Sequence, residues 1–327
     1  MKISVIMGVH NGEQYLSEAI ESILVQSILN FEFIIVDDGS TDNTAKVLLN
    51  FAKKDNRIKI ITLENNKGLP NALNVGIRAS SGEFIARMDC DDISLPERLK
   101  KQLYMIQKSN VDILGTQVVN INQSGRIIKA KTFPKENNNI KYQLPYGNCI
   151  SHPSVMMKKS TLENVGLYNP EYKTSQDYEL WLRLLPKYRF ANLEEPLVQY
   201  RKHHKRINSN QNMHIRTYFS VCAALNYFLI KYHLKTISPN NSTASLIASF
   251  KKLCSLELSI RDKRCINRHM MRLSRKCKLD KNHNQILNKL IIGSATTKEK
   301  YKWLLYKLIS TNIFYKKFNF MEAYYKN

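Results

Sequence analysis

The first 115 residues alternate short apolar runs with amphipathic segments, and this alternation constrains the fold more than any other feature of the chain. The apolar runs are of strand length and lie at residues 3–9, 31–36, 58–63, 83–88 and 111–115. Between them, apolar residues recur at helical spacing over residues 14–24, 41–52, 68–79 and 96–108. Such alternation is typical of a mostly parallel sheet with helices on both faces. We therefore predict an α/β, doubly wound fold.

The regular alternation of strand and helix patterns ends after residue 115. Residues 117–121 and 126–130 predict a hairpin, residues 176–185 a helix and residues 190–200 an extended segment. From about residue 205 onward the pattern is helical, with candidate helices at 212–233, 242–258, 261–276, 282–291 and 297–310. We predict an α/β domain over residues 1–205 and an all-helical C-terminal region over residues 206–327.

The net charge divides at nearly the same place. Residues 1–200 hold 24 Lys and Arg against 22 Asp and Glu, whereas residues 201–327 hold 26 against 5. The two regions should therefore meet different partners. For the basic region, an anionic membrane surface is favoured over a merely solvated helical surface, and nucleic acid is the least favoured partner.

Hydropathy and cysteine spacing indicate where the protein works. The longest apolar stretch, residues 218–230, is shorter than a membrane span and contains Asn226, so no transmembrane helix is expected. No secretory leader is expected either, because the apolar start runs directly into polar residues. The six cysteines form no Cys-x-x-Cys pair, which fits free thiols in a reducing compartment. We expect a cytoplasmic protein. The Lys- and aromatic-rich segment 300–309 would either attach it to the cytoplasmic membrane face or form a helix packed on the catalytic domain.

Two acidic clusters follow two of the predicted strands. Asp37 and Asp38 come after residues 31–36, and Asp89, Asp91 and Asp92 come after residues 83–88. In an open α/β sheet, ligands bind beyond the carboxyl ends of the strands. Crowded carboxylates are unfavourable unless a cation compensates them. A hard divalent ion that bridges to a diphosphate explains the second cluster, and this predicts an enzyme that uses a nucleotide-activated substrate.

Each cluster also has a simpler interpretation. The first could be a turn and a helix cap, and the second a solvated acidic loop. Two adjacent aspartates exceed what a turn needs, so we favour a role for Asp38 in accepting hydrogen bonds from a base. In an extended loop, Asp89 and Asp91 would share one side, with Asp92 supporting them. This arrangement favours metal or ribose binding.

Several short motifs occur in an order that resembles one family. They are residues 9–13 (VHNGE), 36–42 (VDDGSTD), 66–68 (NKG) with 71–76, 89–92 (DCDD), 95–98 (LPER), 152–154 (HPS), 176–181 (QDYELW) and 200–203 (YRKH). In this order they resemble the inverting glycosyltransferases of family 2, of the bacterial polysaccharide-biosynthesis type. The resemblance covers roughly residues 2–205. It implies the GT-A fold, whose sheet is doubly wound, mostly parallel and mixed.

The resemblance also implies roles for individual residues. The nucleobase and ribose pocket would be lined by Val9, Asn11, Glu13 and Asp38. Asp89 and Asp91 would form the Asp-x-Asp pair, with Asp91 as metal ligand and Asp92 beside it. Lys67 would lie on a loop over the nucleotide, His203 near the diphosphate, and Asp177 would be the general base. Two departures from the family pattern are His10, where Tyr is common, and Gln176, where Glu is common. His152 is interpreted as structural.

These roles predict a metal-dependent, inverting glycosyltransferase of the hexosyltransferase type. The expected donor is a nucleotide-diphosphate sugar, with UDP favoured, the acceptor a glycan or a lipid-linked glycan in cell-surface polysaccharide synthesis, and the cofactor Mn²⁺ or Mg²⁺. One alternative is a sugar-nucleotide nucleotidyltransferase, although residues 8–13 contain two glycines and no Arg. The other is a nucleic-acid-binding protein that uses the basic region. Neither alternative explains Asp89–Asp92 together with Asp177.

Overall fold

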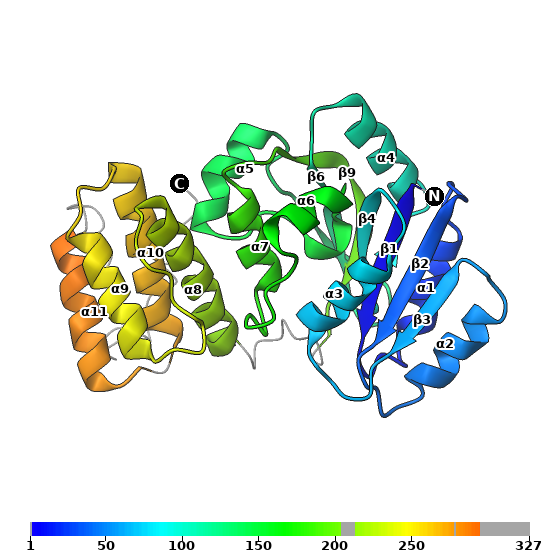
Figure 1. Ribbon diagram of the computed structural model, residues 1–327, viewed down its shortest axis with the longest axis horizontal. Helices are drawn as coiled ribbons and strands as arrows, with labels where there is room; N and C mark the ends of the chain where they lie inside the picture. The colour runs from blue at the N-terminus through cyan, green and yellow to red at the C-terminus, as the bar shows by residue number, and fades with distance from the viewer. Residues whose placement is uncertain (1, 204–212, 278, 295–327) are drawn as a thin grey trace. The chain divides into compact units, whose positions relative to one another are not determined.

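The computed structural model describes residues 2–203, 213–277 and 279–294 (Figure 1). The chain forms two compact units, of which the first comprises Met1–Tyr227 with Ser238–Asn240 and the second Phe228–Ile237 with Asn241–Asn327. The boundary expected between residues 205 and 206 falls outside the described residues. Most of the predicted helix at 212–233 belongs to the first unit by its contacts.

The first unit contains a nine-stranded mixed sheet in the order β3-β2-β1-β4-β8-β6-β9-β5, with β7 paired to β6. Its parallel half consists of β1 (Ile3–Val9), β2 (Phe31–Asp37), β3 (Ile58–Thr62) and β4 (Phe84–Asp89). Its other half consists of β5 (Ile93–Ser94), β6 (Ile113–Ile121), β7 (Ile127–Lys131), β8 (Met156–Lys158) and β9 (Phe190–Arg201). Among these, β6 and β9 run parallel and the other pairings are antiparallel.

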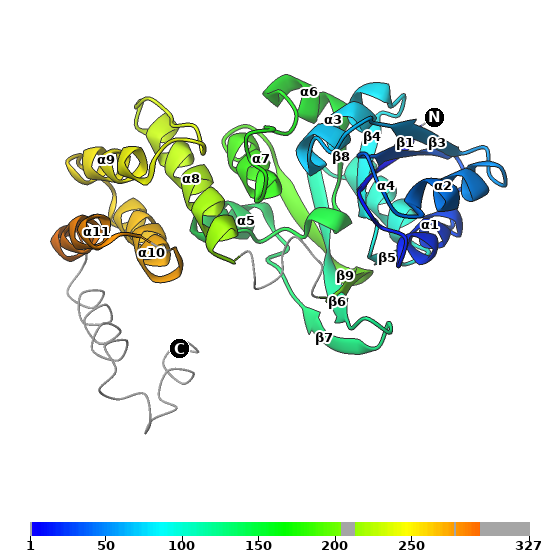
Figure 2. The same cartoon turned by 90° about the horizontal axis from the view of Figure 1, so that it is seen from below.

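Helices cover both faces of the parallel half, as Figure 2 shows. One face carries α1 (Leu16–Leu24), α2 (Thr44–Ala52) and α4 (Arg98–Lys108), and the other carries α3 (Leu69–Ala79). Every residue of β1 and β2 is buried, as expected for strands enclosed on both sides. The predicted α/β fold, with a mixed sheet and helices on both of its faces, is therefore confirmed.

The second half of the sheet differs from the prediction at β5, which was not predicted, and at β6. The expected strand 111–115 and the first hairpin arm 117–121 form one continuous strand, β6. The polar residues in its middle are buried, and other parts of the chain satisfy their hydrogen bonds. Ser154 Oγ accepts from the Thr116 N–H at 3.1 Å, and Gln117 Nε2 donates to the carbonyls of Phe133 and Leu193 at 3.2 and 3.1 Å. The predicted hairpin itself is confirmed, because β7 pairs antiparallel with β6.

Three helices and two 3₁₀ turns lie between β7 and β9 in the chain. They are α5 (Asn137–Gln143), which the sequence did not predict, α6 (Lys159–Val165) and α7 (Gln176–Leu184), with 3₁₀ turns at Leu144–Tyr146 and His152–Ser154. Trp181, Leu180 and Leu184 of α7 are completely buried, as their helical spacing predicted. This packing fixes the position of the first turn of α7, which contains Asp177.

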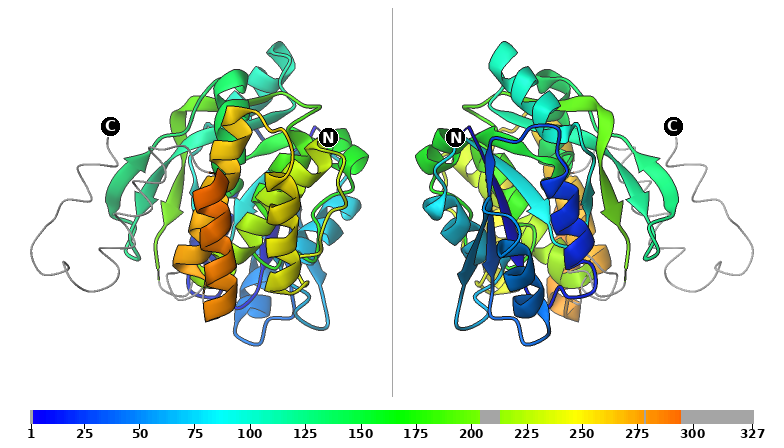
Figure 3. Two further views of the ribbon diagram at one scale, coloured as in Figure 1. Left: turned by 90° about the vertical axis from the view of Figure 1, so that its left-hand side faces the viewer. Right: turned by 90° about the vertical axis from the view of Figure 1, so that its right-hand side faces the viewer.

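The second unit is helical throughout its described residues. The helix α8 (Met213–Lys231) begins in the first unit and ends in the second, which adds α9 (Thr243–Cys254), α10 (Ile260–Lys276) and α11 (Lys281–Ser294). Figure 3 shows the last three, coloured yellow to orange, packed side by side. The predicted helix at 297–310 and the segment 300–309 lie outside the described residues. In residues 2–203, 213–277 and 279–294, no helix combines the length and hydropathy needed to cross a bilayer.

Candidate active site

Three parallel strands deliver the acidic clusters to one edge of the sheet. In the β1–β4 register Gly8 lies opposite Asp89, and in the β1–β2 register Val9 lies opposite Asp37. The chain leaves all three strands at this level. The two clusters that the sequence singled out therefore meet at the carboxyl edge, where ligands bind in open α/β sheets.

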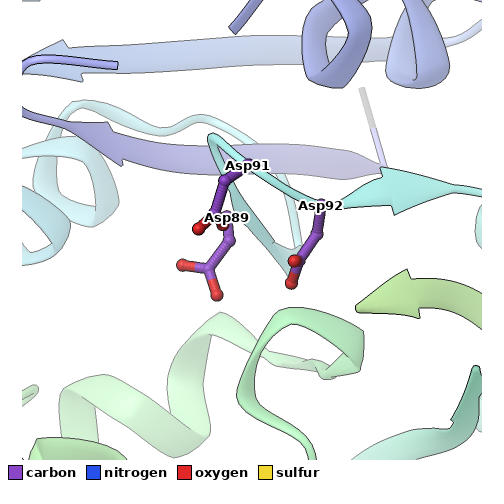
Figure 4. Close-up of side chains that lie close together, drawn as sticks. All are labelled: Asp89, Asp91 and Asp92. Atoms are coloured by element: carbon purple, nitrogen blue, oxygen red, sulfur yellow. The ribbon is translucent and has the colours of Figure 1, made fainter. Parts of the chain in front are cut away.

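Asp89, Asp91 and Asp92 form a compact group that we call the aspartate triad. One ligand atom from each of the three lies within 4.8 Å of the others, and Figure 4 shows the three carboxylates around the turn that follows β4. Hard divalent cations such as Mg²⁺ prefer carboxylate oxygens. The spacing and the donor chemistry of the triad fit one such ion.

Each member of the triad already has a basic or N–H partner. Asp89 forms an ion pair with Arg87, and Asp92 accepts the backbone N–H of Arg201 at 2.9 Å. Asp91 lies 2.8 Å from Nε2 of His203. These partners offset the negative charge of the triad.

Two buried arginines lie beneath the triad. Burial lowers the pKa of the Arg87 guanidinium, but the charge of Asp89 outweighs this and raises it above the ordinary value. Burial and the charge of Arg87 lower the pKa of Arg98 to about 9, so Arg98 still carries its proton at neutral pH. Arg98 donates to the carbonyl of Arg87 at 2.6 Å and to Gln102 Oε1 at 3.0 Å. The guanidinium groups of Arg87 and Arg98 thus place two fixed positive charges close to the triad.

The end of β9 is fastened over the triad by Arg201. Its Nε donates to the carbonyl of Asp91 at 3.0 Å, and its guanidinium lies 4.6 Å from the ring centre of Tyr15 in the turn before α1. The ring of His203 lies 5.0 Å from the same tyrosine ring. His203 Nδ1 is buried and has no hydrogen-bond partner among the residues that the structure describes. This arrangement places a second imidazole nitrogen next to the triad.

The carboxylate of Asp38 holds the loop that carries Lys67. Its two oxygens accept the backbone N–H groups of Lys67 and Gly68, each at 2.8 Å. Gly39 has a φ of +67°, and a Cβ there would lie 2.7 Å from the backbone carbon of Asn65. Only glycine fits this close approach. The contact of Asp38 with a base, which the sequence suggested, stays a prediction, because the contact that the structure contains is with this loop.

The residues after β1 join that strand to the start of α2. Asn11, at a φ of +52°, accepts the Thr41 N–H through Oδ1 at 2.8 Å. Glu13 accepts the Asn43 N–H at 3.0 Å, which satisfies one of the N–H groups before α2. These two contacts explain why α2 begins at Thr44 and not at residue 41 as predicted. Val9 is buried, and its carbonyl accepts the Asp38 N–H at 2.8 Å.

Asp177 stands in the first turn of α7 and is half-buried. Asn148 Nδ2 donates to its Oδ2 at 2.7 Å. Burial raises the pKa of the Asp177 carboxyl above its ordinary value, although the hydrogen bonds from Tyr178 and Asn148 and the charge of Arg87 oppose this rise. The charge of Asp89 raises the pKa further, so Asp177 and the triad share one electrostatic environment. A carboxylate of raised pKa at such a place can act as a base.

Lys131, on strand β7, lies within the electrostatic field of Asp177. Partial desolvation by neighbouring groups lowers the pKa of Lys131, and the charge of Asp177 opposes this change. The Lys131 ammonium also lies 4.6 Å from the centre of the Phe133 ring. The Asp177 carboxylate therefore interacts electrostatically with the negative charge of Asp89 and with the positive charge of Lys131.

His152 is enclosed, as its structural interpretation expects. Its Nε2 lies 2.8 Å from the Tyr168 hydroxyl, and its ring packs edge-on against Tyr168 and Trp181. Burial lowers the pKa of His152 well below its ordinary value, with Arg87 contributing to the same shift. At neutral pH the ring is uncharged, and it packs against Trp181 of α7.

The sequence interpretation did not find Arg87, Arg201 or Asn148 as site residues. Arg87 had one usable signal, since it is a charged residue inside an apolar run that was predicted to be a buried strand. Arg201 lies within a motif that was quoted, but nothing in the pattern indicated its contact with Asp91 and Asp92 about 110 positions earlier. Asn148 lies in a loop whose sequence has no distinctive pattern.

Comparison with known proteins gives a consistent result. The family model described as Glycosyl transferase family 2 matches residues 4–165. The O-antigen biosynthesis glycosyltransferase WbnJ of Escherichia coli is 41% identical over 234 residues, covering 70% of this chain and 89% of that protein. The E. coli UDP-Glc:alpha-D-GlcNAc-diphosphoundecaprenol beta-1,3-glucosyltransferase WfgD is 30% identical over 240 residues, covering 70% of this chain and 91% of that protein.

Solved structures of similar fold cover nearly the whole chain. S. aureus TarS 1-349 in complex with UDP-GlcNAc has a TM-score of 0.61 at 19% identity, covering 93% of this chain and 92% of that one. The mannosyltransferase PcManGT of Pyrobaculum calidifontis, in complex with GDP-Man and Mn2+, has a TM-score of 0.51 at 14% identity, covering 97% and 88%. At these identities the likeness concerns the fold. The GT-A fold predicted from the sequence is confirmed.

Proposed function

Because this chain belongs to glycosyltransferase family 2, we propose that it transfers a sugar from a UDP-sugar to a lipid-linked glycan in bacterial polysaccharide synthesis. Two relatives support the choice of substrates. WbnJ is named for O-antigen biosynthesis, and WfgD for the use of UDP-Glc and a diphosphoundecaprenol-linked acceptor.

One observation carries the proposal. The triad lies at the carboxyl edge of β4, and Asp177 of α7 lies within the electrostatic influence of Asp89. A group that can hold a cation beside a diphosphate is therefore paired with a group that can accept a proton. Sugar transfer from a nucleotide donor needs both.

The donor side consists of residues that fit their proposed roles. Asp91 and Asp92, with Asp89, would hold Mg²⁺ or Mn²⁺, which would offset the negative charge of the leaving diphosphate. His203 Nε2 lies 2.8 Å from Asp91, so His203 would hold that carboxylate in place beside the diphosphate. The nucleoside would lie over Val9, Asn11, Glu13 and Asp38, with the Lys67 loop beside it.

On the acceptor side, Asp177 takes the proton of the attacking hydroxyl. The hydroxyl oxygen bonds the anomeric carbon as the bond to the diphosphate oxygen breaks, and attack from the opposite face inverts the configuration. Asn148 fixes one oxygen of Asp177 and so orients the other. The raised pKa makes Asp177 a stronger base than an ordinary aspartate, and general-base help of this kind is typically worth about 10²–10⁴-fold.

The proposal is tested by presenting the full-length protein with a panel of UDP- and GDP-sugars, Mn²⁺ and a synthetic alkyl-diphosphate glycan. Mass spectrometry of the acceptor should show a gain of one hexose or acetylhexosamine from a UDP-sugar, and proton NMR an inverted anomeric linkage. Asp177→Asn should lose the transfer while its UDP affinity stays within a few-fold of wild type. A retained anomeric configuration, or equal loss of UDP binding in Asp177→Asn, would contradict the assignment.

A further inference from the structure

The hairpin of β6 and β7 carries cations that the donor side of the site does not use. Among the described strands β7 pairs with β6 alone, and it lies at the edge of the sheet (Figure 2). Residues 117–133 contain Arg126, Lys129 and Lys131 and no Asp or Glu. Lys129 and Lys131 are exposed, and within the described part of the chain neither forms an ion pair with a carboxylate. The hairpin is therefore a positively charged surface of the first unit.

The two lysines lie on one face of the sheet. In the β6–β7 register Lys131 lies opposite Val118, and Lys129 lies opposite Asn120. Directly opposed residues share a face, and so do residues two apart on a strand, so both lysine side chains lie on the same face. At about 3.3 Å per residue, their backbone positions are about 6.6 Å apart. Two ammonium groups at this spacing can contact one doubly charged anion together.

Hydrogen bonds connect the end of this hairpin to the loop that orients the proposed base. Asn192 Nδ2 donates to the carbonyl of Pro134, just after the hairpin, at 2.7 Å and to the carbonyl of Cys149 at 3.4 Å. The residue before Cys149 is the one whose amide donates to the Asp177 carboxylate. The ammonium of Lys131 lies within the electrostatic field of that carboxylate. The lysine end of β7 and the proposed base therefore border one region of the first unit.

The surroundings of Lys131 favour an added negative charge. Partial desolvation lowers the pKa of Lys131, the charge of Asp177 opposes this change, and the like charge of Lys129 adds to it. The glutamates of the neighbouring strand β9 are already paired, because Glu194 and Glu195 each contact another lysine. A phosphate group in contact with both lysines of β7 would offset their mutual repulsion.

The hairpin becomes apolar beyond the two lysines. Ile127 and Ile128, which precede Lys129 on β7, are 69% and 55% exposed. Along β7 and away from the proposed base, the order is therefore Lys131, Lys129 and then two exposed isoleucines. A lipid-linked glycan has the matching order of sugar, diphosphate and hydrocarbon chain.

We propose that Lys129 and Lys131 of β7 bind the diphosphate of the lipid-linked acceptor, so that a sugar close to that diphosphate presents its hydroxyl to Asp177. This deepens the proposed function and rests on it, because that function supplies the class of acceptor. Ammonium groups bind phosphate oxygens through charge-assisted hydrogen bonds. Since the lysines and the base border the same region, the glycan between them is short. The reaction that supplies the acceptor is therefore one that attaches the first sugar to a lipid phosphate.

The size of the effect follows from the kind of contact. At an exposed site, a charge-assisted hydrogen bond to one lysine contributes about fivefold in affinity. Removing both lysines should therefore weaken binding of a diphosphate acceptor about 25-fold. An acceptor without the diphosphate has no group for the lysines to contact, so its affinity should stay nearly unchanged.

The experiment uses the full-length protein with saturating UDP and Mn²⁺, which keep the diphosphate of the probe out of the donor site. The probes are undecyl-diphosphate GlcNAc and undecyl GlcNAc, which lacks the diphosphate, and calorimetry measures their affinities. The test variant is Lys129→Gln/Lys131→Gln, and Lys129→Arg/Lys131→Arg keeps the charge. The matched control, Lys53→Gln/Lys54→Gln, removes the same charge from exposed positions just after α2.

We expect wild type to bind the diphosphate probe more tightly than the uncharged probe. The glutamine variant should lose about 25-fold in affinity for the diphosphate probe and less than about twofold for the uncharged one. The arginine variant and the α2 control should keep the preference. Equal losses for the two probes, an unchanged affinity for the diphosphate probe, or an equal loss in the α2 control would each overturn the proposal. So would a glutamine variant that keeps the preference and instead loses binding to phosphatidylglycerol vesicles.

The lysine site and the proposed function can fail separately. Thermal unfolding, UDP affinity and transfer from a UDP-sugar are therefore measured for wild type and for each variant. If wild type transfers sugar and the glutamine variant keeps its KM for the diphosphate acceptor, the lysine site is rejected and the proposed function stands. If the probe binds in a lysine-dependent way and no sugar is transferred, the site is supported and the proposed function is rejected.

Discussion

At Asp177, the carboxylate proposed as the base is also one that burial disfavours in its ionised form. Its pKa in the folded protein lies above that in the unfolded chain. The stability that this group contributes is therefore present at low pH and is lost as the pH rises through the folded pKa. At neutral pH the ionised Asp177 carboxylate, which is the form that can accept a proton, therefore lowers the stability of the fold.

Replacing this carboxylate should improve stability while it removes activity. We predict that Asp177→Asn lowers kcat by about 10²–10⁴-fold and raises the melting temperature at pH 7, because the buried charge is gone while an acceptor for Asn148 remains. Calorimetry at a series of pH values should show the gain shrinking as the pH approaches 4. A lower melting temperature at pH 7 would mean that burial does not disfavour the charge.

Asn148 should tune the pKa of the same carboxylate. Its hydrogen bond favours the ionised form of Asp177, so Asn148→Ala should raise that pKa further. The acid limb of the kcat/KM profile should then move to higher pH, with the plateau reduced by the loss of orientation. Asn139→Ala, an exposed asparagine on α5, is the control and should leave the profile unchanged. A shift toward lower pH would refute the role given to Asn148.

The sequence could predict those site residues that directly follow a strand. Runs such as Asp37-Asp38 and Asp89–Asp92 are local in the chain, and strand-end geometry brings them together. Partners from distant segments could not be predicted, because the contacts of Arg201 with Asp91 and Asp92 depend on how β9 returns past β4. The contacts of Asp38 with the backbone N–H groups of Lys67 and Gly68 were missed for the same reason.

At the scale of elements, β2 carries an acidic residue that ties three parts of the sheet together. The buried carboxylate of Glu32 accepts from Ser4 Oγ at 2.6 Å and from the Ser81 N–H at 2.6 Å, and it pairs with Lys59 at 2.7 Å. Burial would raise the pKa of Glu32, but these partners outweigh it and lower the pKa from 4.5 to about 2. The ionised form is therefore stabilised by the fold.

Glu32→Gln should destabilise the first unit at neutral pH by about 3 kcal/mol, the linkage energy of that pKa change. The stability is present above the unfolded pKa of 4.5 and is lost as the pH falls through about 2. Urea unfolding at pH 7 and pH 3 should show a smaller difference at the lower pH. Glu64→Gln, at an exposed position, serves as control. The same penalty at both pH values would show that packing and not charge holds this junction.

Element prediction succeeded where periodicity is strong and failed where tertiary contacts decide. The four parallel strands and the helices α1, α3, α7 and α10 follow from apolar spacing alone. The two-residue strand β5 has too few residues to show a period, and α5 has Ile140 as its buried residue. The sequence interpretation divided β6 into strands at 111–115 and 117–121, whereas contacts with distant groups satisfy the buried polar Thr116 and Gln117 and the strand continues through them.

At the scale of the whole molecule, the charge difference between the two regions appears in the sequence without any structure. Composition therefore predicted two regions with different partners. It could not place the division, since the contacts of α8 assign most of that helix to the first unit. It also could not show which side of α10 is buried, because that depends on how the helix packs.

Ligand-linked stability tests whether metal and donor act together on the whole chain. With Mn²⁺ present, UDP at about 100 times its Kd should stabilise the protein by about 2.7 kcal/mol and raise the melting temperature by several degrees. With a chelator in place of Mn²⁺, most of this shift should disappear, because the diphosphate would face the triad without a cation between them. An identical shift under both conditions would indicate donor binding that does not use the metal.

The central claim, that the aspartate triad holds a cation against the donor diphosphate, is tested most directly by crystallography of the complex. Crystals grown with UDP and Mn²⁺ should show one strong manganese anomalous peak, in contact with Asp91 and with oxygens of the diphosphate. Crystals of Asp91→Asn under the same conditions should show that peak weakened or absent. A manganese peak remote from residues 89–92, or ordered UDP whose diphosphate lies away from the triad, would contradict the account.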